Sequence, residues 1–132
     1  MEFVEVLKAK LDEVEKLANE IKARNIDKKA QEIEDLVVER LCRIAGISKD
    51  NLYKEEYGEM SSVAEYDDVV SYKHSKLEIT INRTLLKTIL HKAIRKEENI
   101  TVTVREEAGQ VSFIVKDNDS RKYVIDAILY FI

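Results

Sequence analysis

The spacing of apolar residues is three and four in the first 45 positions, and after residue 77 segments with a spacing of two appear on both sides of one further helical segment. Spacings of three and four place apolar side chains on one face of an α-helix, whereas a spacing of two places them on one face of a β-strand. A helical part followed by a part rich in strands predicts an α+β protein, in which a helical hairpin precedes a small sheet.

The first part of the chain, residues 1–46, contains two helical patterns. Charged residues separate the apolar ones in both, as in amphipathic helices. The apolar positions of the first are Val4, Leu7, Leu11, Val14, Ala18 and Ile21, and those of the second are Ala30, Ile33, Val37, Leu41 and Ile44. Gly46 can adopt the left-handed conformation that ends many helices. The pattern therefore predicts an antiparallel helical hairpin that ends at Gly46.

Two apolar stripes of this length are poorly covered in a hairpin of two helices, so a further layer must complete the core. The C-terminal half of the chain is one candidate, and a second copy of the hairpin, in a coiled coil or four-helix arrangement, is the other. We expect the second, a homodimer whose interface is formed by the N-terminal helices. The residues assigned to this interface are Val4, Leu7, Leu11, Val14, Ala18, Ile21, Ile33 and Val37.

Residues 47–76 are the least regular part of the chain and are rich in acidic residues. We expect an acidic, partly irregular connector here. The stretch LCRIAGISKDNLY, residues 41–53, also fits a helix-turn-helix, in which a second helix would enter the DNA major groove. That helix would carry acids such as Glu55 and Glu56 toward the phosphates, which would repel them. We therefore interpret the stretch as a plain helix end.

From residue 77 to residue 132 the pattern predicts a compact strand-helix-antiparallel-meander unit, βαββ(β). LEITI, residues 77–81, alternates as a strand, and Asn82 is suited to cap the helix that follows. ITVTV and VSFIV are predicted strands joined by a hairpin loop. The last segment, residues 122–132, fits either a third strand or a terminal helix. Hairpin, connector and this unit together make the predicted α+β fold.

The predicted helix at residues 83–96 has a basic face opposite its apolar one. Its cationic residues are Arg83, Lys87, His91, Lys92, Arg95 and Lys96. Like charges four positions apart repel each other on a helix, so we expect an anion to compensate them. Acidic residues of the connector or hairpin are one source of that anion, and nucleic-acid phosphates are the other. Lys73, His74 and Lys76, just upstream, are candidates to extend the basic patch.

The sequence has no pattern typical of a catalytic, cofactor or metal site. Its one cysteine, Cys42, lies among apolar residues, and nothing in the sequence places His74 or His91 beside it. KDNDS, residues 116–120, begins like a calcium-binding loop but lacks the glycine and the final glutamate that such a loop needs, so we interpret it as a turn. We therefore predict no catalytic residue, no cofactor and no bound metal, in a protein that is not an enzyme.

Charge and hydropathy limit the environment and the partners. The chain has no secretory signal and no apolar run near the roughly 20 residues that cross a bilayer, so we expect a cytoplasmic protein without membrane contact. Its net charge is −4. Residues 1–70 hold 11 Lys or Arg and 18 Asp or Glu, whereas residues 71–132 hold 11 Lys or Arg and 8 Asp or Glu. Any attraction to a polyanion must therefore come from the second half.

These patterns together predict a small non-enzymatic assembly or adaptor protein. It self-associates as a dimer, or binds a protein partner, through its N-terminal helices. The alternative is a nucleic-acid-associated protein that contacts phosphates through the basic helix at residues 83–96.

Overall fold

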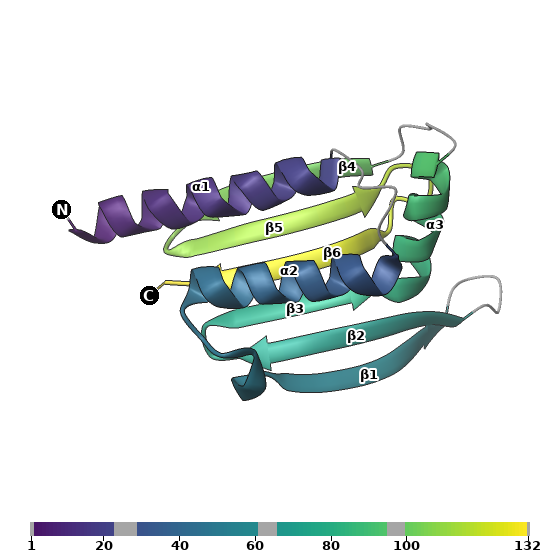
Figure 1. Ribbon diagram of the computed structural model, residues 1–132, viewed down its shortest axis with the longest axis horizontal. Coiled ribbons are helices and arrows are strands. Elements are labelled where there is room, and N and C mark those ends of the chain that lie inside the picture. The colour runs from purple at the N-terminus through teal and green to yellow at the C-terminus, as the bar shows by residue number, and fades with distance from the viewer. Residues whose placement is uncertain (1, 23–28, 61–65, 95–99, 132) are drawn as a thin grey trace.

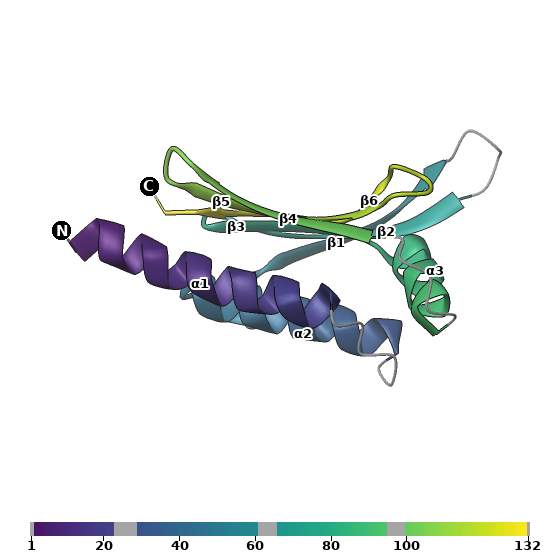
Figure 2. The same cartoon turned by 90° about the horizontal axis from the view of Figure 1, so that it is seen from above.

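The computed structural model describes residues 2–22, 29–60, 66–94 and 100–131. Its elements, in chain order, are α1 (Glu2–Lys22), α2 (Ala30–Ala45), the 3-10 turn η1 (Lys49–Asn51), β1 (Tyr53–Met60), β2 (Tyr66–His74), β3 (Leu77–Asn82), α3 (Arg83–Ile94), β4 (Ile100–Glu107), β5 (Gln110–Asp117) and β6 (Tyr123–Tyr130). They form two layers, in which α1 and α2 lie along one face of the sheet and α3 lies at one end of it (Figures 1 and 2). No helix within the described ranges is long and apolar enough to span a bilayer.

The sheet has six antiparallel strands in the order β1-β2-β3-β6-β5-β4. Two three-stranded meanders, β1 to β3 and β4 to β6, meet at the central β3–β6 pair, where Thr80 lies opposite Asp126. The predicted α+β class is confirmed, but the sheet is larger than predicted, because β1 and β2 come from the segment assigned to an irregular connector. The last segment forms strand β6, so the alternative of a terminal helix is wrong.

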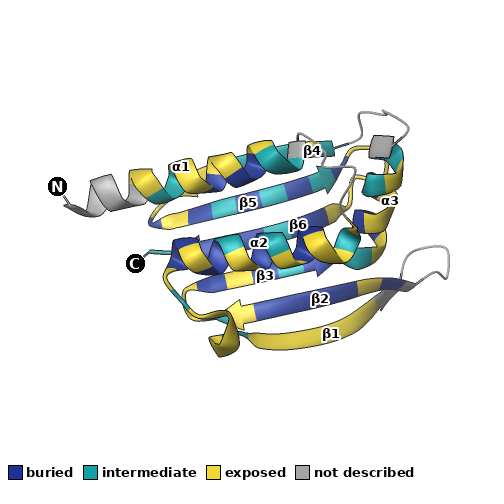
Figure 3. Cartoon of the chain, in the orientation of Figure 1, coloured by how far each residue is buried: buried dark blue, intermediate teal, exposed yellow. Residues whose placement is uncertain are grey.

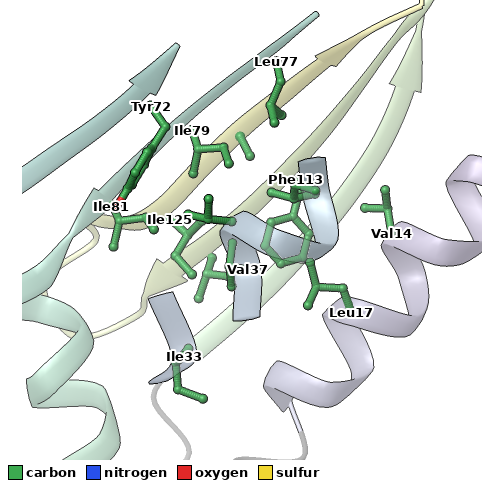
Figure 4. Packing of buried hydrophobic residues seen from close by; sticks show 14 of the residues in the cluster. Val14, Leu17, Ile33, Val37, Tyr72, Leu77, Ile79, Ile81, Phe113 and Ile125 are labelled. Atoms are coloured by element: carbon green, nitrogen blue, oxygen red, sulfur yellow. The ribbon is translucent and has the colours of Figure 1, made fainter. Parts of the chain in front are cut away.

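One hydrophobic core joins the helices to the sheet. Val14 and Leu17 of α1 lie near Phe113 of β5, and Val37 of α2 lies over Ile125 of β6 (Figure 4). These side chains are inaccessible to solvent, and along the central strands buried positions alternate with more exposed ones (Figure 3). Burial of each such side chain contributes about 1.5–3 kcal/mol. The contact between layers is therefore the main stabilising interaction of the fold.

The second helix ends where the sequence predicts. Gly46 has a φ of 73°, its N–H donates to the carbonyl of Arg43 at 3.2 Å, and the N–H of Ile47 donates to that of Cys42 at 3.0 Å. These two bonds satisfy carbonyls at the end of the helix that would otherwise have no partner. The chain then makes the short turn η1 and enters strand β1 at Tyr53. The helix-turn-helix alternative requires a recognition helix after Gly46. The chain forms strand β1 there, so this alternative is wrong.

Two further local predictions are confirmed. The side-chain oxygen Oδ1 of Asn82 accepts a hydrogen bond from the N–H of Leu85 at 3.0 Å, which is the expected cap of α3. KDNDS forms a turn, in which the carboxylate of Asp117 accepts hydrogen bonds from the N–H of Asp119 and the hydroxyl of Ser120 at 3.1 and 3.0 Å. The residues that resemble a calcium loop therefore hold their own turn together.

Replacement of Gly46 tests the conformational part of this account. Gly46→Ala should lower the free energy of unfolding by about 1 kcal/mol, because a Cβ atom disfavours positive φ although nothing lies within 4 Å of it. Gly46→Asn is the matched control. Its free energy of unfolding should fall by less than that of Gly46→Ala, since asparagine tolerates this conformation. Urea denaturation measures both, and equal losses in the two variants would contradict the explanation.

Candidate functional site

The apolar stripes of α1 and α2 face the sheet of their own chain. Val14, Ala18, Ile33 and Val37, all assigned to a dimer interface, are at most 5% exposed in a single chain. Two further members, Leu11 and Ile21, are half-buried and pack against the same core. The side chains of Val4 and Leu7 are not among those that the structure describes. At the described positions the C-terminal half of the chain therefore completes the hairpin core, and the interface through the helices stays a prediction.

Arg83, the first residue of the predicted basic face, is held by acidic side chains of the same chain. Its Nε and Nη2 donate to the two carboxylate oxygens of Glu34 at 2.8 and 2.9 Å, and its Nη1 donates to Glu56 at 3.0 Å. The hydroxyl of Tyr72 donates to Glu34 at 2.7 Å. These four residues come from α2, β1, β2 and α3, so the cluster connects both layers.

The charge states of this cluster follow from the hydrogen bonds and opposite charges that outweigh its burial. Burial by itself raises the pKa of Glu34, but the hydrogen bonds from Arg83 and Tyr72 and the charge of Arg83 outweigh it, so this pKa lies below its ordinary value. The hydrogen bond to Glu34 raises the pKa of Arg83, and burial together with Glu34 raises that of Tyr72. At neutral pH Glu34 is therefore ionised, Arg83 charged and Tyr72 neutral, which suits a structural ion pair.

Lys92, on the next turn but one of α3, is also paired within the chain. Its Nζ lies 2.8 Å from a carboxylate oxygen of Asp119 and 3.4 Å from one of Asp117, in the turn between β5 and β6. The hydrogen bond with Asp119 and the charge of Asp117 raise the pKa of Lys92 above its ordinary value. Acidic residues of the hairpin and the connector compensate Arg83, and those of this turn compensate Lys92.

The remaining members of the basic face do not gather into one patch with the upstream cations. Lys87 and His91 are exposed on α3 and have no ion pair among the described residues, whereas Arg95 and Lys96 lie outside the described residues. His74 and its neighbours Lys73 and Lys76 lie at the β2–β3 turn, and strand β3, about 20 Å long, separates them from α3. The expected extension of the patch by these three residues is therefore wrong.

The described residues contain little that could support catalysis. No group of three His, Cys, Asp or Glu side chains among them is placed to hold a metal ion. Cys42 is buried, and burial raises the pKa of its thiol, which disfavours the reactive thiolate. Every buried side-chain nitrogen or oxygen that is described has a hydrogen-bond partner. That the protein is not an enzyme and has no cofactor stays a prediction.

One face of the sheet carries no helix, and we call it the open face. In Figure 2 all three helices lie on one side of the sheet, and no described element covers the other. Its described residues alternate along the strands with those of the core, and the register places on it Tyr53, Glu55, Tyr57, Ser71, Lys73, Glu78, Thr80, Thr101, Thr103, Arg105, Ser112, Ile114, Asp126, Ile128 and Tyr130. Polar and apolar side chains are mixed on it, as on many antiparallel sheets that face water.

The middle of the open face is acidic. Glu78 of β3 and Asp126 of β6 lie diagonally across the central strand pair, and the hydroxyl of Tyr130 donates to Glu78 at 3.1 Å. Partial burial raises the pKa of Asp126, and the charge of Glu78 raises it further. This negative centre disfavours both nucleic-acid phosphates and a second copy of the same face.

Strand β1 lies at one edge of the sheet and pairs only with β2 among the described strands. Tyr53 and Tyr57 of this strand are 67% and 45% exposed, and both project on the open face. The sequence did not assign these tyrosines to an exposed strand, because residues 47–76 were interpreted as a partly irregular connector. The β-branched and aromatic residues Val69, Val70 and Tyr72 were the available signal that a strand lies next to them.

No family model matches the chain, and neither a curated protein nor a solved structure shows significant similarity to it.

The Glu34–Arg83 pair yields a stability prediction. Arg83→Met should lower the free energy of unfolding by about 3–5 kcal/mol at neutral pH, because it leaves a buried carboxylate without its cation. Arg43→Met removes an exposed pair with Glu39 and should cost at most about 0.5 kcal/mol, which makes it the matched control. Chemical denaturation measures the free energy of unfolding of both variants. Similar losses in the two would show that the buried Glu34–Arg83 pair stabilises the fold no more than an exposed pair does.

The same pair predicts how this loss depends on pH. The pKa of Glu34 is lowered in the folded chain, so its contribution is present above the ordinary value of 4.5 and is lost as the pH falls through the folded value. In Arg83→Met, burial is no longer compensated, and protonation of Glu34 relieves the cost. The stability difference between the unmutated chain and Arg83→Met should therefore shrink as the pH falls toward 4.5, where Glu34 of the variant becomes protonated, and shrink further below 4.5, where the unmutated chain loses its own contribution. A difference that stays constant would contradict this assignment.

The basic face yields a binding prediction. Because Arg83 and Lys92 are paired within the chain, we expect no salt-dependent binding of a labelled DNA duplex or single-stranded RNA at low salt. Lys87→Glu should give the same result as the unmutated chain and as Lys49→Glu, a matched charge reversal on the remote turn η1. Binding that Lys87→Glu abolishes and Lys49→Glu retains would instead support the nucleic-acid alternative.

Proposed function

We propose that this chain is a small non-enzymatic assembly protein that self-associates. The observation that carries the proposal is strand β1, which has an unpaired edge among the described strands and two exposed tyrosines. Exposed strand edges are surfaces on which a further strand can pair through its main chain. The proposal keeps the predicted self-association but places the contact on the sheet, since the described part of the helical stripes is already buried within one chain.

The arrangement of polar groups supports an assembly role over a catalytic one. Active sites commonly hold ionisable groups whose pKa values are shifted by burial and that face a cleft. Here the most strongly buried charged residues, Glu34 and Asp117, accept hydrogen bonds from Arg83, Lys92 and the neighbouring turn. These contacts connect helices to strands, so they are explained by the fold without any substrate.

The nucleic-acid alternative has less support. Of the six cationic residues assigned to the basic face, Lys87 and His91 are the two that are both described and outside an ion pair of the described chain. Two exposed cations, one of them a histidine, supply little of the phosphate neutralisation on which such binding depends. Assembly therefore explains more of the described surface.

Sedimentation velocity over a concentration series tests the proposal. The mean mass should rise from that of one chain toward that of two as the concentration increases into the micromolar range and above. A mass of one chain at every concentration would refute self-association. Hydrogen exchange adds a second readout: protection of α2 should not change with concentration, because its own sheet covers it at all concentrations. Protection of α2 that appears only at high concentration would favour the interface through the helices.

A further inference from the structure

Strand β1 differs from the rest of the sheet in having no cover. The helices α1 and α2 contact β4, β5, β3 and β6, and α3 contacts β2, whereas residues 53–58 of β1 are exposed on both faces (Figures 1 and 3). Neither a proline nor a β-bulge interrupts the pairing of β1 with β2. The outer edge of β1 can therefore accept another strand without displacing any described element.

The sequence of this edge complements itself. YKEEY, residues 53–57, has a tyrosine at each end and places Lys54 and Glu56 symmetrically about Glu55. Two copies that pair antiparallel with Glu55 opposite itself bring each Tyr53 opposite the Tyr57 of the other copy. The same register brings each Lys54 opposite a Glu56, on the face that carries the helices. Cross-strand aromatic pairs and pairs of opposite charge both stabilise antiparallel strands.

We propose that two copies of this chain pair antiparallel through β1, with Glu55 on the two-fold axis, and so join their sheets into one continuous sheet. This inference rests on the proposed function, self-association, and specifies its surface and register. Shifting the register by two positions brings Lys54 opposite Lys54, or Glu56 opposite Glu56, and separates the tyrosines. The register centred on Glu55 is therefore the one that pairs both the aromatic and the charged side chains.

The other surfaces of the sheet suit a second copy less well. Helix α1 lies along β4 at the opposite edge (Figures 1 and 2). Strands pair about 4.8 Å apart, whereas packed helix axes need about 8–10 Å, so pairing through β4 would force two copies of α1 together. Packing of two open faces would bring the acidic pair Glu78 and Asp126 toward its own copy. Neither objection applies to β1.

Two features set the expected strength of the dimer. The two Glu55 carboxylates meet near the axis and repel each other, although Lys73 of β2 lies 3.9 Å from Glu55 and offsets part of this charge. Pairing through one strand also buries less than the roughly 1,200 Å² typical of stable complexes. We therefore expect a dimer that dissociates on dilution.

Single cysteine variants test the register directly. In Glu55→Cys the two new cysteines face each other, within the roughly 4.4–6.8 Å between Cα atoms that a disulfide needs. In Lys54→Cys and Glu56→Cys the cysteines of the two copies lie diagonally, beyond that range. Under mild oxidation, Glu55→Cys should give a disulfide-linked dimer on a non-reducing gel, and the other two variants should not. The unmutated chain is the control for Cys42, which is buried.

Each result of this experiment either supports or overturns the inference. A dimer linked through Cys at position 54 or 56 would show a different register. No linked dimer from any of the three variants, with the unmutated chain dimeric in sedimentation, would show that the copies meet elsewhere, while self-association would stand. A monomeric unmutated chain would refute the proposed function together with this inference. Thermal denaturation of each variant confirms that it is folded.

Tyrosine variants give a readout that does not depend on cysteine. Tyr53→Ala should raise the dissociation constant of the dimer about two- to thirtyfold, because it removes both cross-strand tyrosine pairs. Tyr123→Ala is the matched control, since Tyr123 is 55% exposed but lies on β6, away from β1. Equal dissociation constants for Tyr53→Ala and Tyr123→Ala would contradict the proposed pairing.

Discussion

The structure depends on the burial of two helical stripes on one face of a single sheet. Two adjacent helices cover a width of about 20 Å, which corresponds to about four strands. The contacts of α1 with β4 and β5, and of α2 with β3 and β6, account for four strands. Strand β2 is covered in part by α3, and β1 lies beyond the helices. The width of the helical layer thus explains why one edge strand is exposed on both faces.

Ion pairs within the chain neutralise part of the basic face of α3. Viewed as a helix alone, α3 presents a row of cations that suggests an anionic ligand. In the fold, Glu34 reaches Arg83 from α2, and Asp117 and Asp119 reach Lys92 from the turn between β5 and β6. A buried ion pair with matched geometry contributes little net stability compared with apolar residues, but loss of one partner is costly. These pairs therefore fix the position of α3 at the end of the sheet and leave few cations for a ligand.

The open face and the β1 edge offer different kinds of contact. The open face mixes threonine, serine and charged residues, and its acidic centre disfavours a second copy. The edge offers main-chain hydrogen-bonding groups and a short sequence that complements itself. Charged residues on an edge strand usually prevent indiscriminate pairing. In β1 the same charges can select one partner and one register, because Lys54 and Glu56 match when the strand meets its own copy.

Local patterns in the sequence determined most of the individual elements. The spacing of apolar residues located α1, α2, β3, α3, β4 and β5, and local chemistry explained the helix end at Gly46 and the cap at Asn82. These features depend on residues only a few positions apart. Strand β1 was missed because it is exposed on both faces and carries charged residues on both. Strand β2 was missed because its buried residues 69–72 are consecutive, so no alternation of apolar and polar residues marks it as a strand.

Tertiary structure alone decided which surfaces are covered. Whether the apolar residues of α1 and α2 meet a second copy or their own sheet depends on contacts such as that between Val14 and Phe113, which are 99 positions apart. Whether Arg83 is paired or exposed depends on Glu34, which is 49 positions away. A sequence pattern states which face of an element is apolar or charged, but it does not state what lies opposite. That is settled by the packing of distant segments, because the same apolar stripe gains similar free energy against any apolar surface that fits it.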